Sequence, residues 1–362
     1  MHKPPKIKTA MINMLKGVFT NKQNRQAIYI AEIGLNHNGD FNAAISMIHA
    51  AANAGANAVK LQTITPELLN SVYTKSLLAG EPLQADTEAI DFFRKFIFSP
   101  EEYGKLKAAA ENDGMVFFSS PFDAKALSLL EDVNVPLYKI ASSEVTNLRL
   151  VKQIAATGKP ALMSTGISSQ QEIAAAINTF KAAGGGELVL FHCVSAYPTE
   201  SEAANLMRIP ALAAAFGLPV GLSDHSVSGK AFVPAAVLGA RIFERHFMLD
   251  ENFDCPDKAV SSAPEEFSRL IKETEEALLM IGDGAIDYGA AEEAAARAAR
   301  RSLFAAVDIE AGQVVTEDDI VALRPGCGIS ASEYDKICGL VANAHISKGS
   351  LLDMKMFDKV KR

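Results

Sequence analysis

The segment ARIFERHFMLD, residues 240–250, places three ionisable side chains at the end of an apolar run. In an extended strand, alternation puts Glu244 and His246 on one face and Arg245 on the other. Ionisable groups on a buried face are costly unless a partner compensates them, and a divalent metal ion is one such partner. A second histidine, His225, ends the apolar run LPVGLSDH. The two imidazoles predict a site for one divalent ion if these runs form neighbouring strands.

Two lysines and several hydroxyl groups belong to similar apolar runs. Lys60 lies in AVKLQT and Lys139 in LYKIASS. Ammonium and hydroxyl groups that converge on one place are suited to a small anion, such as a phosphate or a carboxylate. A carboxylate such as Glu32, in AIYIAEIG, is suited to orient a water molecule or to complete a metal shell. The polar residues near the ends of all these runs are Glu32, Asn36, His37, Lys60, Gln62, Ser119, Ser120, Lys139, Ser142, Glu144, Ser164, Thr165, His192, Ser195, Ser223, Asp224, His225, Glu244 and His246.

The elements that must position these residues are parallel strands whose carboxyl ends meet. Helix-like stretches separate the apolar runs, and this strict β/α alternation predicts a (β/α)8 TIM barrel with its active site at the C-terminal ends of the strands. An open doubly wound sheet is disfavoured, because the sequence contains no GxGxxG and no GxxxxGK[ST] motif. The expected strands cover residues 27–34, 58–63, 115–122, 137–143, 160–166, 188–195, 218–225 and 240–247.

The composition divides the chain into four parts. Residues 1–26 carry basic but no acidic side chains and are expected to form a flexible basic N-terminal extension. Residues 27–282 hold the barrel, and the alanine-rich residues 283–299 are expected to be a partly helical linker. In residues 300–362, the segments VDIEAGQVVTEDDI and AHISKGSLLDMKMF share one outline, which predicts a small two-fold β module.

The overall composition excludes several classes of protein. With 362 residues, 49% hydrophobic and 22% charged, the chain is typical of a globular enzyme with a large core. A net charge of −8 speaks against nucleic acid as a partner, and no apolar run reaches the roughly 18 residues of a membrane span. The four cysteines form no CxxC pair, which disfavours a disulfide framework or a zinc finger. A cytoplasmic location is expected.

Eight motifs together resemble those of the sialic acid (nonulosonate) synthase family, which includes synthases of neuraminate, legionaminate and pseudaminate. They are AEIGLNHNGD, AVKLQT, YKIASSE, STGISSQQEI, HCVSAYPT, GLSDHS, ERHFMLD and LRPGCGI, in the family's order, and the resemblance covers about residues 27–358. It implies a TIM barrel followed by a C-terminal SAF (antifreeze-like) domain. It also implies a transferase that condenses phosphoenolpyruvate with an N-acylated hexose to a nine-carbon 2-keto sugar acid and phosphate.

The resemblance implies roles for particular residues. His225 and His246 would bind the divalent ion, manganese or magnesium, and Glu32 would handle protons near the aldehyde and the attacking water. Arg324, in LRPG, would reach the N-acyl group from the partner chain of a domain-swapped homodimer. Contacts to phosphoenolpyruvate are implied for Lys60, Lys139, Ser120, Ser142, Ser164 and Ser223. Contacts to the sugar are implied for Gln62, Glu144, Tyr197, Asp257 and Arg324.

Three departures from the family pattern leave the acceptor sugar open. Ser195 stands where some neuraminate synthases have asparagine, Ser143 stands where glycine is frequent, and DENFDCPDKAVSS replaces a more familiar segment. Legionaminate, pseudaminate or a related product therefore remains open beside neuraminate. Two other functions are alternatives: a synthase of seven- or eight-carbon keto acids, against which the SAF domain and LRPG speak, and a non-catalytic sugar-binding protein on the same fold.

Overall fold

The computed structural model describes residues 27–359, so the extension expected at residues 1–26 lies outside the described part. The chain divides between Gly282 and Asp283 into two compact units, which are described separately below. Within the described residues, no helix is both long enough and apolar enough to cross a membrane.

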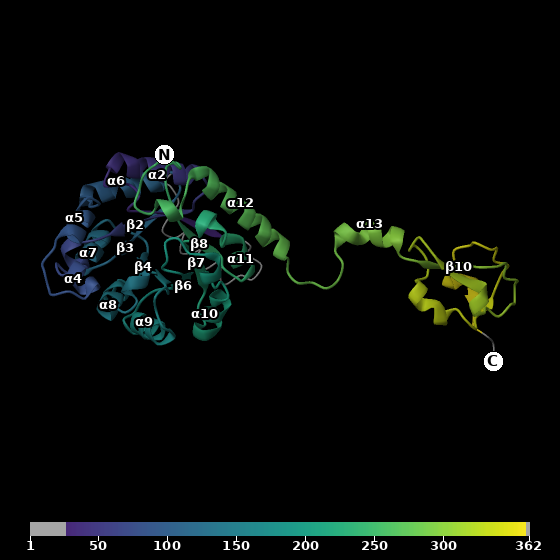
Figure 1. Ribbon diagram of the computed structural model, residues 1–362. Coiled ribbons are helices and arrows are strands. Elements are labelled where there is room, and N and C mark those ends of the chain that lie inside the picture. The colour runs from purple at the N-terminus through teal and green to yellow at the C-terminus, as the bar shows by residue number, and fades with distance from the viewer. Residues whose placement is uncertain (1–26, 360–362) are drawn as a thin grey trace. The chain divides into compact units, whose positions relative to one another are not determined.

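The first unit is a closed parallel barrel (Figure 1). Each strand pairs with the next one along the chain, and β1 also pairs with β8, which closes the barrel and confirms the predicted fold. A two-residue strand, β9 (Ser261–Ser262), pairs with the carboxyl end of β8 and was not predicted. The barrel strands are β1 (Ile28–Gly34), β2 (Ala58–Thr63), β3 (Val116–Pro121), β4 (Tyr138–Ile140), β5 (Ala161–Ser164), β6 (Leu188–Cys193), β7 (Val220–Asp224) and β8 (Ile242–Phe247).

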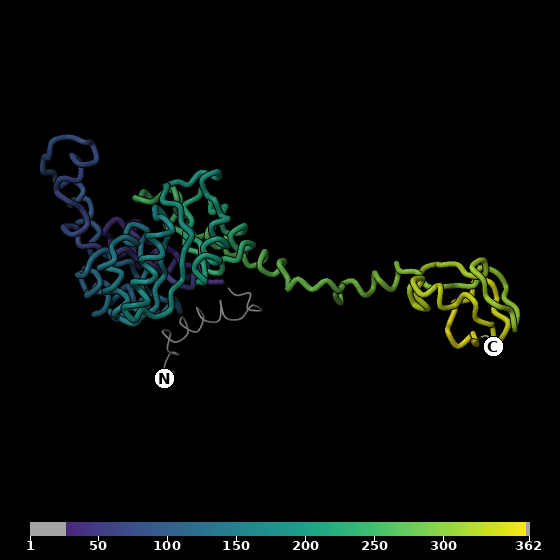
Figure 2. Tube along the Cα trace, turned by 90° about the horizontal axis from the view of Figure 1, so that it is seen from below, coloured from purple at the N-terminus to yellow at the C-terminus, as the bar shows by residue number. Residues whose placement is uncertain are grey.

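Helices follow the strands and surround the barrel (Figure 1). The main ones are α2 (Phe41–Asn53), α6 (Pro100–Asn112), α7 (Ala124–Asp132), α8 (Leu148–Ala156), α9 (Gln170–Ala182), α10 (Arg208–Phe216), α11 (Phe232–Val237) and α12 (Pro264–Ile281). Residues 64–98, between β2 and α6, contain three short helices and project from the barrel in Figure 2. They are α3 (Pro66–Leu69), α4 (Thr74–Ala79) and α5 (Glu88–Arg94).

Local sequence signals set where several barrel helices begin. The Asp40 side chain accepts hydrogen bonds from the first backbone N–H groups of α2. Ser99 with Glu102 opens α6 and Ser169 with Glu172 opens α9, each as a reciprocal capping box. Such caps satisfy N–H groups that have no partner within the helix, and they thereby fix the residue at which each helix begins.

Strand alternation fills the barrel interior with apolar side chains at one end and polar ones at the other. On β1, Ile28 and Ile30 belong to the buried interior cluster, and the next position on the same face is Glu32. Strand β8 repeats this order with Ile242, Glu244 and His246, so the carboxyl ends of the strands bring ionisable groups into a buried space. The interior apolar cluster comprises Ile28, Ile30, Ala58, Val116, Phe118, Leu137, Leu162, Val189, Phe191 and Ile242.

The second unit is a small β module preceded by α13 (Ala290–Ala299). Strand β10 (Ser302–Ala305) pairs antiparallel with β11 (Ile320–Leu323), and β12 (Val341–Ala342) pairs with β13 (Phe357–Asp358). The two similar sequence segments meet at Ile309 and Ile346, which exchange backbone hydrogen bonds of 2.9 Å in both directions. The matching glycines, Gly312 and Gly349, both have left-handed φ angles, 85° and 80°, which explains why the repeat requires glycine there.

Candidate active site

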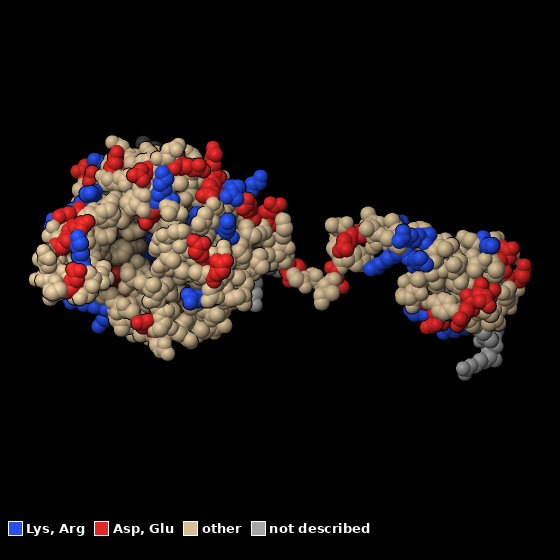
Figure 3. Space-filling model, viewed as in Figure 1, with Lys and Arg blue, Asp and Glu red and all other residues tan. Residues whose placement is uncertain are grey.

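A cavity of about 270 Å³ lies at the carboxyl ends of the barrel strands. Figure 3 looks onto this face, where the surface of the barrel unit is hollowed. The structure brings most of the sequence-predicted barrel residues to this one cavity, which is where a (β/α)8 enzyme carries its active site. Those that line it are Glu32, Lys60, Gln62, Ser120, Lys139, Ser142, Ser164, Tyr197, Ser223, His225 and His246.

Two buried lysines and two buried glutamates form one charge network in the cavity. Lys60 Nζ lies 2.7 Å from Glu32 Oε2 and 3.8 Å from Glu244 Oε1, and Lys139 Nζ lies 3.0 Å from both oxygens of Glu244. Burial alone would raise the pKa of Glu244, but the charges of Lys139 and Lys60 outweigh it and lower that pKa to about 2. Burial likewise opposes the charge of Lys60, yet Glu244 and Glu32 raise its pKa. The cavity therefore holds paired charges that an anionic ligand can share.

Strand register explains how this network is assembled. Glu32 is paired with Lys60 on one neighbouring strand and with His246 on the other. Ser223 is paired with Glu244, and its hydroxyl donates to Glu244 Oε1 at 2.9 Å. The register therefore places Glu32, Lys60 and His246 side by side, and it places Ser223 beside Glu244, one inward-facing position before His246 on β8.

Glu32 is held from two sides. Gln62 Nε2 donates to Glu32 Oε1 at 3.0 Å, while Oε2 forms the ion pair with Lys60. Gly34 makes this arrangement possible: its φ is +24°, and a Cβ there would lie 2.3 Å from Glu32 Oε1 and 2.8 Å from Gln62 Nε2. A side chain at position 34 would therefore displace the carboxylate.

The two predicted metal ligands lie next to each other. The ring centroids of His225 and His246 are 5.4 Å apart, and the Tyr197 ring covers His225 at 4.1 Å. Burial, together with the neighbouring His246, lowers the pKa of His225 to about 3, which keeps this imidazole neutral. His225 Nδ1 lies 2.8 Å from the carbonyl oxygen of Val194, so donation from Nδ1 leaves a lone pair on Nε2.

These residues fit a divalent ion bound by two imidazoles. His246 Nδ1 lies 3.3 Å from Asp257 Oδ2, a carboxylate–histidine contact of the kind that orients metal-ligating rings. No cluster of three or more His, Cys, Asp or Glu suited to a metal occurs within residues 27–359, so other ligands would be water or substrate. The residues that would hold the ion are His225 and His246.

Two predicted sugar contacts of the barrel unit, Asp257 and Glu144, do not line the cavity. Asp257 lies against His246, as described above. Glu144 ends the short helix η1 (Ser142–Glu144) and accepts a hydrogen bond of 2.9 Å from Asn147, the residue that caps α8. Arg324 is exposed and belongs to the second unit.

The cavity lining includes residues to which sequence reasoning gave no substrate role, among them Glu244 and Cys193. Glu244 is bound by Lys139 and Ser223, and its inward position was readable from the alternation Ile242, Glu244, His246. Cys193 is buried and is paired in register with Ser223, but a single cysteine at the end of an apolar run carries no distinguishing signal.

A closed barrel with a charged cavity at its mouth, joined to a small β module, defines the class of enzyme to which this chain belongs. The model of the NeuB family matches residues 47–286, and that of the SAF domain matches residues 300–358. The chain therefore belongs to the NeuB family, which confirms the resemblance seen in the sequence.

Several named relatives of this chain are nonulosonic acid synthases. The chain is 35% identical over 325 residues to the pseudaminic acid synthase of Helicobacter pylori, covering 89% of this chain and 95% of that protein. It is 32% identical over 333 residues to the N,N'-diacetyllegionaminic acid synthase of Campylobacter jejuni, covering 91% and 99%. The crystal structure of the N-acetylneuraminic acid synthetase from Leptospira borgpetersenii superposes with a TM-score of 0.66 at 34% identity, covering 75% of this chain and 90% of that one.

Proposed function

We propose that this protein condenses phosphoenolpyruvate with an N-acylated hexose to form a nine-carbon 2-keto sugar acid and inorganic phosphate. The observation that carries the proposal is the single cavity that combines two buried lysines, two buried carboxylates, serine hydroxyls and two adjacent imidazoles. Phosphoenolpyruvate carries a phosphate and a carboxylate, and both require cationic and hydroxyl donors.

Phosphoenolpyruvate would be bound by Lys60 and Lys139, with hydroxyl donors around them. Each ammonium group is paired with a carboxylate, Lys60 with Glu32 and Lys139 with Glu244, and an anionic ligand could share these cations. The hydroxyls proposed to complete this subsite are those of Ser120, Ser142, Ser164 and Ser223, all of which line the cavity.

The reaction forms one carbon–carbon bond and breaks one carbon–oxygen bond. The C3 atom of the enol bonds to the aldehyde carbon of the open-chain sugar, whose oxygen takes up a proton. Water adds at C2 with loss of one proton, which leaves a hydroxyl there. The C2–O bond to phosphate then breaks, the hydroxyl proton passes to the departing phosphate, and a ketone remains. A manganese or magnesium ion on His225 and His246 would supply Lewis-acid polarisation of the aldehyde oxygen.

Glu32 is the proposed proton carrier. Gln62 donates to its Oε1 atom and the Lys60 ammonium group lies 2.7 Å from its Oε2 atom, so the carboxylate is oriented in the cavity, where it can take up or release a proton. Gln62 and Tyr197 line the cavity and are proposed, with Glu144, Asp257 and Arg324, to contact the sugar. Arg324 would come from a partner chain, which makes the proposed active form a homodimer.

The acceptor is proposed from the relatives' names. Pseudaminic and legionaminic acid synthases are both about one-third identical to this chain over most of its length, so an N-acylated hexose that leads to one of these products is the proposed substrate. Ser143 and Ser195, which depart from the neuraminate pattern, both line the cavity.

The test is phosphate release from phosphoenolpyruvate with Mn²⁺, across a panel of N-acyl hexoses and with five- and four-carbon aldose phosphates as separate arms. Phosphate release that depends on an N-acyl hexose, with a nine-carbon product by mass spectrometry, supports the proposal. Release with the shorter aldose phosphates alone would instead establish an eight- or seven-carbon synthase. Sugar binding without phosphate release under all conditions would establish a binding protein.

A further inference from the structure

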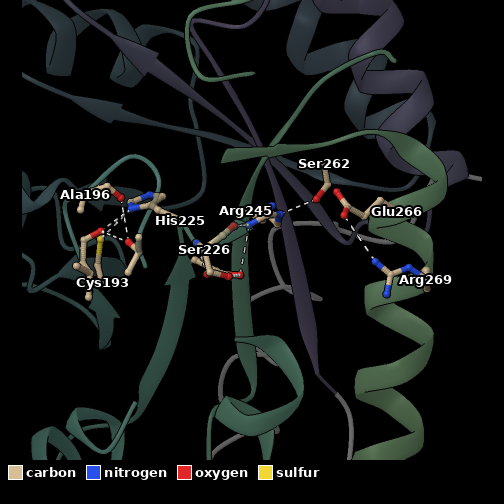
Figure 4. A network of polar contacts seen from close by, with 11 residues as sticks. Cys193, Ala196, His225, Ser226, Arg245, Ser262, Glu266 and Arg269 are labelled. Atoms are coloured by element: carbon tan, nitrogen blue, oxygen red, sulfur yellow. Dashed lines mark hydrogen bonds and ion pairs between the residues drawn. The ribbon is translucent and has the colours of Figure 1, made fainter. Parts of the chain in front are cut away.

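Arg245 is the residue of the ERH motif that faces away from the cavity, and it is 1% exposed. Its guanidinium makes three hydrogen bonds on the outer side of the barrel (Figure 4). Nε donates to Ser262 Oγ at 2.5 Å, and Nη1 donates to the carbonyl oxygen of Ser226 at 2.8 Å and to Asp224 Oδ2 at 3.3 Å. One side chain therefore connects β8, the end of β7 and β9.

Two of these partners flank His225 in the chain. Asp224 and Ser226 are its two neighbours in the chain, and Asp224 Oδ1 accepts from the backbone N–H of Ser226 at 2.8 Å while Oδ2 accepts from its hydroxyl at 3.1 Å. Asp224 is also paired in register with Arg245. The turn that presents His225 to the cavity is thus closed by Asp224 and tied to β8 by Arg245.

The same arginine precedes His246 in the chain. We infer that Arg245 is a positioning residue that sets the spacing of the His225 and His246 rings from outside the barrel. Arg245 anchors the chain on both sides of His225 and directly precedes His246, so displacement of either chain segment relative to the other requires the loss of a buried hydrogen bond. The inference rests on the proposed function, in which these two rings bind a divalent ion.

Fold stability does not by itself explain this arrangement. A buried ion pair is often matched or exceeded in stability by apolar side chains of similar volume, so Arg245 with Asp224 is weak evidence for a stabilising role. Glu266 of α12 adds a further negative charge near the guanidinium, and Glu266 is itself 3.6 Å from Arg269. A planar fork that donates in several fixed directions suits the holding of two chain segments, which a single ammonium group cannot reproduce.

The test measures Mn²⁺ binding to the metal-free full-length protein by electron paramagnetic resonance, without substrates. Arg245→Lys is expected to weaken Mn²⁺ binding by about 10- to 100-fold, the usual effect of losing a group that orients a metal ligand. Ser262→Ala removes one hydrogen bond and is expected to weaken binding by a smaller factor. The matched control is Arg241→Lys, directly before the same strand, where the guanidinium donates to the carbonyl oxygens of Ala236 and Ala240.

The outcomes separate this inference from the proposed function. Weaker Mn²⁺ binding in the Arg245 and Ser262 variants, with normal binding in Arg241→Lys at comparable melting temperature, supports it. Unchanged Mn²⁺ affinity in a folded Arg245→Lys protein overturns it while the metal site stands; if that variant does not fold, unchanged affinity in Ser262→Ala does the same. No Mn²⁺ binding by the wild type overturns the metal site itself, and this inference with it.

Discussion

Lys139 on β4 and Glu244 on β8 contact each other across the barrel, with the ammonium nitrogen 3.0 Å from both carboxylate oxygens. The two strands are four positions apart in a ring of eight, so the pair spans the interior instead of joining neighbours. Lys139 also lies 3.9 Å from the centroid of the Phe191 ring. Both residues of this pair line the cavity, and Phe191 belongs to the apolar cluster of the barrel interior.

Replacement of Lys139 by methionine tests the proposed phosphoenolpyruvate site. The variant keeps most of the side-chain volume but leaves Glu244 with Lys60 at 3.8 Å as its nearest remaining ammonium group in the cavity. The KM for phosphoenolpyruvate should rise at least 10-fold in steady-state assays, since loss of a charged hydrogen bond costs about 1.5–3 kcal/mol. The KM for the sugar should change much less. Lys152→Met, exposed on α8, is the control; an effect confined to the sugar would show that Lys139 is misassigned.

Removal of the divalent ion tests the two imidazoles. A chelator should abolish turnover, and added Mn²⁺ or Mg²⁺ should restore it, because polarisation of the aldehyde would be lost without a Lewis acid. His225→Ala and His246→Ala should each lose Mn²⁺ affinity in a direct binding measurement and nearly all activity. His49→Ala, at an exposed site on α2, should retain both. Full activity in chelator, or in either cavity variant, contradicts the assignment.

The proposed proton carrier is tested by Glu32→Gln. Glutamine keeps the shape of the side chain and its contact with Gln62, but it cannot take up a proton, so kcat should fall by roughly 10²–10⁴. The melting temperature should be followed as well, because the variant leaves Lys60 without its 2.7 Å partner. Glu81→Gln, exposed in the insertion, is the control. An unchanged kcat would make Glu32 a structural residue.

The sequence was sufficient to predict the barrel and the convergence of its polar strand ends. Eight apolar runs separated by helical stretches leave little choice of fold, and alternation along β1 and β8 directs Glu32 and His246 inward. The contact between Lys139 and Glu244 was not predictable, because it depends on how the barrel closes and on the reach of two side chains from opposite strands. Strand β9 is only two residues long and has no periodicity to detect.

Side chains outside the strands were harder to place for a different reason. Asp257 follows β8 within a long connection, and its contact with His246 depends on loop conformation that no periodicity encodes. Arg245 was readable as an outward residue, but its partners Ser226 and Ser262 come from a turn and from the unpredicted β9. Contacts that depend on the conformation of loops and turns could therefore not be predicted from the sequence.

The buried imidazole of His37 makes stability depend on pH. His37 is 1% exposed, packs on Phe98 at 4.5 Å between centroids, and accepts a hydrogen bond of 3.0 Å from the backbone N–H of Gly39 at Nδ1. Burial lowers its pKa to about 4 from an unfolded value of 6.5. Below pH 6.5 the unfolded chain therefore binds a proton that the folded chain does not, so this contribution is present above pH 6.5 and is lost as the pH falls toward 4.

The comparison that isolates this effect is wild type against His37→Asn, whose side-chain oxygen can replace Nδ1 as acceptor. Between pH 7 and pH 5, the free energy of unfolding should fall by about 2 kcal/mol more in the wild type than in the variant. Urea unfolding at both pH values measures the difference, and contributions from groups common to both proteins cancel. Equal losses in the two proteins would show that His37 does not titrate in this way.

Arg324 is the residue expected to act from the second unit. A neutral N-acyl sugar in an open barrel mouth is bound weakly, and a guanidinium fork that covers it would add directed hydrogen bonds and exclude water. Arg324→Ala should therefore raise the KM for the sugar at least 10-fold, while binding of phosphoenolpyruvate and Mn²⁺ stays near normal. Arg297→Ala, exposed on α13 in the same unit, is the control and should leave the KM for the sugar unchanged.

Mixed dimers test whether Arg324 acts on the partner chain. A His246→Ala chain has a defective barrel but an intact Arg324, and an Arg324→Ala chain has the reverse. If each barrel is completed by its partner, a heterodimer contains one site in which both residues are intact, and activity should recover to as much as half of the wild-type value per heterodimer. Differently tagged chains, purified as heterodimers and assayed for phosphate release, provide the measurement. Activity no higher than that of the separate parents would mean that Arg324 acts within its own chain or not at all.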